Sequence, residues 1–125
     1  MYKDLLAVIE LGGYPDFSPL YEALGFSVHM ETSVRNAMRR LKQIEPRVIV
    51  AEFNFQSDFR DRTSSLESLM SVAQRMPDCR VIVFYEQEFA HQLERFTSQH
   101  PVFAILTFPI DESRLKQTLQ QALAS

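Results

Sequence analysis

Residues 48–52 read Val-Ile-Val-Ala-Glu, four consecutive apolar residues followed by a carboxylate. A short apolar run without polar alternation is typical of a strand that is covered on both faces, as strands of parallel sheets are. Four further runs of similar length follow this pattern in the chain: Leu5–Ile9, Phe26–Met30, Val81–Tyr85 and Val102–Leu106. The run over 26–30 is the least apolar because Ser27 and His29 interrupt it, which predicts an edge strand with one wetter face.

Segments with helical periodicity separate these five runs. The pattern predicts helices over 19–24, between Ser33 and Pro46, after Ser64 or Ser65, from Phe89 to the residue before Pro101, and after Asp111. The serines and the aspartate are suitable N-caps, and Gly25 suits the left-handed position that ends a helix. Strands and helices therefore alternate along the whole chain.

This alternation predicts an α/β fold in a single domain over 1–125. Five strands joined by right-handed helical crossovers indicate a doubly wound five-stranded parallel sheet of the flavodoxin-like type, order 2-1-3-4-5, with five helices. The stretch from Phe53 to Ser64 is long for a connection between a strand and a helix in such a fold.

The composition is that of an ordinary globular domain. The chain has 125 residues, 46% of them hydrophobic, and 13 basic against 16 acidic residues give a net charge of −3. Three glycines argue against a glycine-rich phosphate loop, and the single cysteine, Cys79, excludes a disulfide framework. No apolar run approaches the length of a signal peptide core or a membrane span. We therefore expect a cytoplasmic protein that does not enter a membrane.

Residues 33–47 are strongly basic, with five Lys or Arg residues against Glu45 and a local charge of +4. The cations share this segment with a regular apolar face, so we interpret them as the solvated outer side of a helix. An acidic protein partner is the better functional alternative, and we expect no binding of nucleic acid because no recognition helix or aromatic stacking platform accompanies the charge.

Ligands of open parallel sheets bind beyond the carboxyl ends of the strands, so the residues at these ends are the candidates for a functional site. They read Glu10-Leu11-Gly12-Gly13, Glu52-Phe53-Asn54, Tyr85-Glu86 and Thr107-Phe108-Pro109. With these ends, nearly the whole chain resembles a response-regulator receiver domain of the CheY-like family. The resemblance rests on Val48–Glu52, Leu24-Gly25-Phe26, Val81–Phe84 and Ala104–Ile110, the last being similar to the family's Y-L-x-K-P-F segment, in which the Lys–Pro bond is typically cis.

The resemblance implies phosphoryl transfer to an aspartate at the end of the third strand. In receivers an acidic pair after the first strand holds Mg²⁺, a Thr or Ser ends the fourth strand, and a Lys ends the fifth. This chain has Glu52 at the phosphoacceptor position, Glu10 followed by Leu11 at the acidic pair, Tyr85 at the Thr/Ser position and Phe108 at the Lys position; only Pro109 is retained. We therefore predict a degenerate pseudo-receiver with no catalytic residue, no enzymatic activity and no metal site or cofactor.

Two alternatives remain for the altered strand ends. The chain could be an atypical phosphoacceptor of a two-component system that uses Glu52 or, from the long loop, Asp58. It could also sense a small ligand or a divalent cation such as Mg²⁺ through Glu10, Glu52 and Glu86. Glu52 itself is either a fixed mimic of the phosphorylated acid or a relic, and we favour the relic because one carboxylate imitates a phosphate only in part. Tyr85 and Phe108 are interpreted as filling of the vacated site rather than as an apolar plug or docking point.

From the altered strand ends we predict that the chain recognises another protein in signal transduction, independently of phosphorylation. Phe53, Phe55 and Phe59 in the long loop either fold over the former active site or form an exposed contact surface. Receivers often bind partners or form homodimers through helix four, strand five and helix five. Helical phase then places candidate contact residues at Gln92, Arg95, Ser98, Gln99, Gln117 and Gln121.

Overall fold

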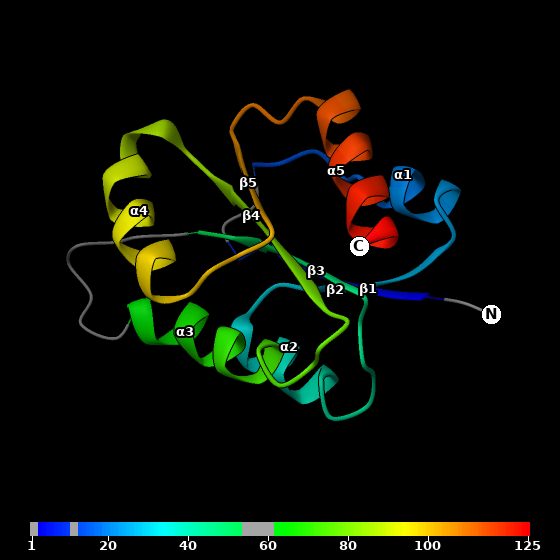
Figure 1. Ribbon diagram of the computed structural model, residues 1–125, viewed down its shortest axis with the longest axis horizontal. Helices are drawn as coiled ribbons and strands as arrows, with labels where there is room; N and C mark the ends of the chain where they lie inside the picture. The colour runs from blue at the N-terminus through cyan, green and yellow to red at the C-terminus, as the bar shows by residue number, and fades with distance from the viewer. Residues whose placement is uncertain (1–2, 11–12, 54–61) are drawn as a thin grey trace.

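The computed structural model describes residues 3–10, 13–53 and 62–125 (Figure 1). Its strands are β1 (Lys3–Val8), β2 (Phe26–Glu31), β3 (Val48–Glu52), β4 (Arg80–Tyr85) and β5 (Ala104–Thr107). Its helices are α1 (Ser18–Ala23), α2 (Val34–Arg40), α3 (Arg62–Ala73), the 3₁₀ turn η1 (Gln87–Phe89), α4 (Ala90–Gln99) and α5 (Glu112–Ala124). The five strands form one parallel sheet in the order β2-β1-β3-β4-β5, so the predicted topology and the edge position of β2 are confirmed.

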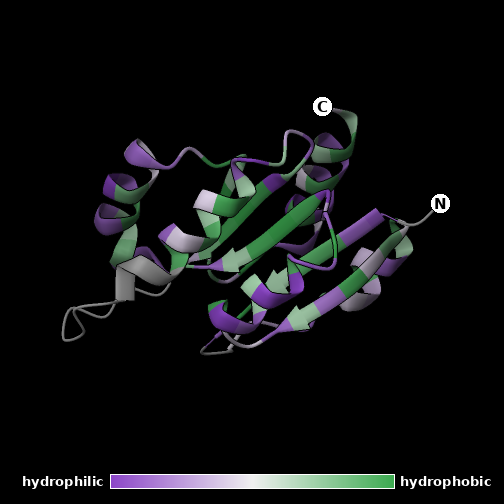
Figure 2. Cartoon of the chain, turned by 90° about the horizontal axis from the view of Figure 1, so that it is seen from below, coloured by the Kyte–Doolittle hydropathy of each residue, from purple (hydrophilic) through white to green (hydrophobic). Residues whose placement is uncertain are grey.

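Helices cover both faces of the sheet (Figure 1). The sheet therefore divides the core into two layers. One layer lies under α2, α3 and α4 and includes Leu6, Ile49 and Leu93. The other layer lies under α1 and α5 and includes Leu5, Phe84 and Leu115. Both layers have fully buried strand residues, and the middle parts of the central strands are hydrophobic in Figure 2, whereas charged residues lie at the strand ends. Burial on both faces is why these strands read as continuous apolar runs.

Three predicted helix boundaries are supported by local geometry. The Ser33 hydroxyl accepts a hydrogen bond from the Asn36 backbone N–H at 3.1 Å, and the Asp111 carboxylate accepts one from the Ser113 N–H at 3.0 Å. Both are therefore N-caps, of α2 and α5 respectively. Gly25, after α1, has a φ of +94°, the left-handed conformation that favours glycine.

Other boundaries differ from the prediction. The helix predicted to continue to Pro46 ends at Arg40, because the N–H groups of Lys42 and Gln43 donate to carbonyls three residues back and tighten the chain into a turn. The helix α3 begins at Arg62, so Ser64 and Ser65 lie inside it and are not its caps. Phe89 belongs to η1 rather than to α4, and Val102 precedes β5. Within the described ranges no helix is long and apolar enough to cross a bilayer.

Candidate functional site

The carboxylate of Glu52 lies at the carboxyl end of the central strand β3. Its Oε1 accepts a hydrogen bond from the backbone N–H of Glu10, just beyond the end of β1, at 2.8 Å. The neighbouring parallel strands β1 and β3 bring these two positions together, as the sequence predicts. The contact uses the main chain of Glu10, whose own side chain is exposed, and Leu11 lies outside the described residues.

An aromatic group occupies the end of the neighbouring strands. The ring of Tyr14, in the loop between β1 and α1, lies 5.4 Å from the ring of Phe84 and 5.3 Å from that of Phe108. The Tyr14 and Phe108 rings meet edge to face at 84°, the arrangement that aromatic quadrupoles favour. Phe17 contacts the other side of Phe84 at 6.1 Å. We call Tyr14, Phe17, Phe84 and Phe108 the aromatic stack.

Phe108 is the exposed member of this stack, with 39% of its surface accessible. Its backbone N–H donates to the carbonyl of Tyr85 at 2.7 Å, which holds the end of β5 against β4. The bond between Phe108 and Pro109 is cis, as the resemblance implies for the equivalent Lys–Pro bond. An aromatic ring therefore stands at the position that the resemblance assigns to a lysine, and the edge-to-face contact with Tyr14 fixes the orientation of that ring.

Tyr14 is the residue of this site that the sequence reasoning missed. Burial, together with the negative charges of Glu52 and Glu86, raises the pKa of its phenol far above the ordinary value. The phenol therefore remains protonated at neutral pH and is a neutral donor beside two carboxylates. The only signal in the sequence is an aromatic residue directly after Gly12-Gly13, in a loop that parallel-sheet proteins use for ligands.

Tyr85 and Phe53 belong to the opposite core layer. Tyr85 is half-buried and packs against the cluster under α2, α3 and α4. Phe53 is only 7% exposed; its N–H donates to the Phe84 carbonyl at 2.7 Å and its ring lies 5.7 Å from that of Phe96. As a surface contact the Phe53 prediction is wrong, because the ring of Phe96 in α4 covers it. Phe55, Asp58 and Phe59 lie outside the described residues.

The predicted partner residues of α4 divide into two groups. Arg95, Ser98 and Gln99 are exposed, as helical phase predicts. Gln92 does not lie on the outer face, since it is half-buried and its Oε1 is enclosed without a hydrogen-bond partner in the described part of the chain. The rule of helical phase misplaces Gln92 because it lies beside Leu93, on the edge of the helix that turns toward the sheet.

The predicted residues of α5 line a hollow. Gln117 and Gln121 are exposed and border, with Ile105 of β5 and Arg114, a depression of about 510 Å³ between β5 and α5. Ile105 is 43% exposed and Phe103, two residues earlier, is 36% exposed. The edge strand β5 thus presents apolar side chains beside polar amides, a combination typical of protein interfaces.

The strand ends lack a group of side chains suited to a metal ion in the described part of the chain. Among residues 3–10, 13–53 and 62–125, no three His, Cys, Asp or Glu side chains are grouped so that they could hold a metal ion. The convergence of Glu10, Glu52 and Glu86 on one cation is therefore not seen in the described part of the site. Glu52 and Glu86 both act electrostatically on Tyr14, which lies near them.

The sequence matches no protein-family model and no curated protein sequence. Solved structures do match. The signal receiver domain of an HD domain-containing protein from Pseudomonas fluorescens Pf-5 has a TM-score of 0.75 at 16% identity, covering 99% of this chain and 96% of that one. The chemotaxis response regulator CheY4 of Vibrio cholerae has 0.73 at 15%, covering 98% and 99%. A response regulator from Thermotoga maritima has 0.75 at 14%, covering 98% and 99%. The chain therefore has the CheY-like fold of response-regulator receiver domains.

Proposed function

We propose that this domain recognises a protein partner in a cytoplasmic signalling pathway without passing through a phosphorylated state and without enzymatic activity. The observation that carries the proposal is the contact of Phe108 with Tyr14 at the end of β5. The resemblance assigns this position to a lysine whose ammonium neutralises the transferring phosphoryl group. A phenyl ring supplies no such charge, and Tyr14 adds a neutral phenol rather than a cation.

Electrostatics at Glu52 support the same proposal. A phosphoryl group adds up to two negative charges, and its transfer is stabilised by cations and donors placed around it. Here Glu86 and Glu52 both lie close enough to Tyr14 to raise its pKa, so the immediate surroundings already carry two carboxylates. Oε1 of Glu52 also accepts a hydrogen bond from the Glu10 N–H, which withdraws electron density from the carboxylate and makes it a weaker nucleophile toward phosphorus.

The surface formed by α4, β5 and α5 is the partner site that the structure favours. It combines the exposed Phe103 and Ile105 with the hollow that Gln117 and Gln121 border. Because β5 is an edge strand, its outer backbone edge is not paired within the sheet. We propose that a protein, with a second copy of this chain as the simplest candidate, covers this surface.

Phosphorylation is tested with a small phosphodonor. The chain is incubated with acetyl phosphate or phosphoramidate and Mg²⁺, beside a receiver that retains its aspartate as positive control, and intact mass is recorded. We expect no change in mass for this chain while the positive control gains about 80 Da. A Mg²⁺-dependent gain that disappears in Glu52→Gln would overturn the proposal in favour of the atypical phosphoacceptor.

The partner surface is tested by self-association. Sedimentation velocity is compared for the native chain, for Ile105→Glu and for the control Gln120→Glu, an exposed residue of α5 that does not border the hollow. We expect a concentration-dependent dimer that Ile105→Glu abolishes and Gln120→Glu retains. A dimer that resists Ile105→Glu would contradict this surface. A strictly monomeric native chain would exclude the second copy as partner.

A further inference from the structure

The exposed side of α2 carries a row of unpaired cations. Arg35, Arg39 and Lys42 are separated by four and three residues, which places them on one side of the helix and its final turn. All three are exposed, and in the described ranges none of them forms an ion pair. We call these residues the basic stripe. Its charge is directed to solvent and is not neutralised by any ion pair within the described part of the chain.

A hollow of about 320 Å³ adjoins the basic stripe. Its lining consists of Glu31, Asn36, Arg39, Arg40 and Gln43. Four of these five side chains can donate hydrogen bonds, and they lie at positions i, i+3, i+4 and i+7, which places them on one side of α2 and the turn after it. The hollow thus presents amide and guanidinium donors in a row and contains no apolar side chain.

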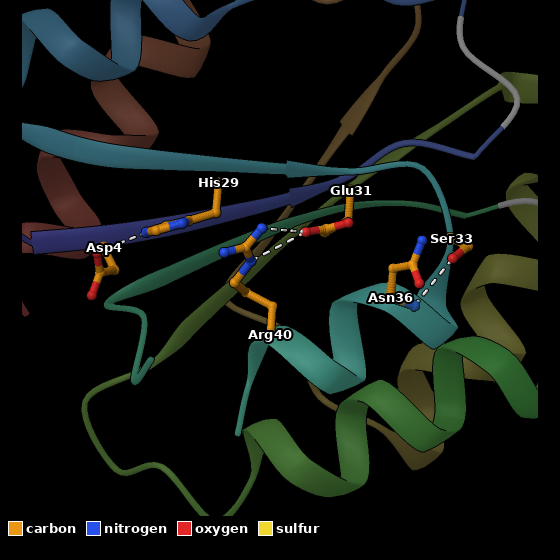
Figure 3. A network of polar contacts seen from close by, with 6 residues as sticks. All are labelled: Asp4, His29, Glu31, Ser33, Asn36 and Arg40. Atoms are coloured by element: carbon orange, nitrogen blue, oxygen red, sulfur yellow. Dashed lines mark hydrogen bonds and ion pairs between the residues drawn. The ribbon is translucent and has the colours of Figure 1, made fainter. Parts of the chain in front are cut away.

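The one carboxylate in the hollow is already paired (Figure 3). Arg40 donates from Nε at 3.1 Å and from Nη2 at 2.9 Å to the same oxygen of Glu31, Oε2. This pair fixes the guanidinium on the surface of β2 and neutralises Glu31, while Nη1 of Arg40 takes no part in the two bonds. The arginine is therefore held in place before any ligand arrives, which lowers the entropic cost of binding.

The position of Arg47 shows that the basic charge of this segment serves two purposes. Its Nη2 donates to the carbonyl of Leu123 at 3.3 Å, so this arginine binds the end of α5 at the opposite end of the sheet. Arg47 supports the fold, whereas the basic stripe and the hollow face solvent.

We propose that the basic stripe and the adjoining hollow bind an acidic segment of a partner protein, with one carboxylate side chain seated between Arg39 and Arg40. The amides of Asn36 and Gln43, the guanidinium of Arg39 and the remaining Nη1 of Arg40 supply donors to the planar oxygens of a carboxylate. This surface lies at the β2 side of the sheet, whereas the partner surface of α4, β5 and α5 lies at the other edge. The two sites can therefore be occupied together, and neither depends on phosphorylation.

An acidic protein segment fits better than nucleic acid. Among the residues that the structure describes, no aromatic side chain lines the hollow, so bases have no stacking platform there. The residues outside 33–47 carry a net charge of −7, which repels a long polyanion but not a short acidic segment. The helix α2 has only seven residues, too few to follow a nucleic-acid backbone.

Fluorescence anisotropy of a labelled peptide of alternating Glu and Ser residues tests the proposal. The full chain is titrated at low and at moderate ionic strength, with the corresponding Gln and Ser peptide as neutral control. We expect saturable binding of the acidic peptide only, weakened by salt because the attraction is electrostatic. Replacing Arg35, Arg39 and Lys42 together by Glu should weaken binding at least about tenfold, and Arg39→Gln alone should weaken it several-fold.

The matched control replaces Lys3, Arg75 and Lys116 by Glu, three exposed cations of other segments that border neither hollow, with the same change in net charge. This variant should bind the peptide within about twofold of the native chain. Equal loss in both triple variants, or no saturable binding at low salt, would overturn the proposal. Tighter binding of duplex DNA or of phosphatidylserine vesicles through Arg35, Arg39 and Lys42 would replace it with a different polyanion. Circular dichroism verifies that each variant is folded.

Discussion

The edge-to-face contact between Tyr14 and Phe108 should be measurable as a coupling free energy. We consider the cycle of Tyr14→Leu, Phe108→Leu and the double variant, in which leucine keeps an apolar side chain and removes the ring. Aromatic pairs contribute about 0.5–1.5 kcal/mol beyond the burial of their area. Since Phe108 is 39% exposed and Tyr14 is only half-buried, we expect the lower part of that range, about 0.5–1 kcal/mol.

Urea unfolding followed by far-ultraviolet circular dichroism gives the free energies, because the chain has no tryptophan to report on unfolding. The contact of Tyr14 with Phe84 makes Tyr14→Leu the costlier single variant, but this cost cancels in the cycle. The control cycle combines Tyr14→Leu with Phe96→Leu, whose ring lies in the other core layer, and should be additive within about 0.5 kcal/mol. A Tyr14–Phe108 coupling no larger than this control would refute the claim that Tyr14 fixes Phe108.

Three further predictions concern single groups. Burial raises the pKa of the Cys79 thiol to about 11. A chromogenic disulfide reagent at pH 8 should therefore label the native chain about a hundredfold more slowly than the urea-unfolded chain, because the thiolate is the reactive form. Equal labelling rates would contradict the burial of Cys79. Burial also raises the pKa of Tyr21 above its usual 10.0, so the folded state keeps this proton when the unfolded state loses it. Below pH 10 the urea concentration at the unfolding midpoint should therefore not depend on Tyr21. Above pH 10 this midpoint should fall with rising pH, and it should fall less steeply in Tyr21→Phe than in the native chain. Ser33→Ala should lower the free energy of unfolding by about 1 kcal/mol through loss of the α2 cap, whereas Ser71→Ala inside α3 should be near neutral; equal effects would show that the cap is not special.

The strands were predictable because burial on both faces leaves a direct mark on the sequence. Runs such as Val48–Ala51 and Val81–Tyr85 contain no residue that would suit a solvated face, and the observed strands lie within two residues of them. Helix ends were harder to predict because they depend on local hydrogen bonds. The turn after Arg40 forms through backbone hydrogen bonds of Lys42 and Gln43, and the side chains of these residues do not indicate such bonds in the sequence.

The candidate site was predictable where it consists of strand ends. Glu52, Tyr85 and Phe108 lie at the carboxyl edge because parallel strands share that edge. The partner of Phe108 was not predictable, since Tyr14 reaches it from a loop whose path no periodicity encodes. The sequence likewise left open whether Phe53 is buried or exposed, and the placement of Phe96 on α4 shows that it is covered.

The division of the core by the sheet has a consequence for how this domain can change over generations. Phe84 and Tyr14 pack in the layer under α1 and α5. Tyr85, which follows Phe84 in the sequence, and Phe53, whose N–H donates to the Phe84 carbonyl, pack in the layer under α2, α3 and α4. Side chains of the two layers are separated by the backbone of the strands, so a replacement in one layer can be accommodated there without repacking the other. The surface near α2 can thus acquire or lose a binding partner by gradual substitution while the aromatic stack stays intact.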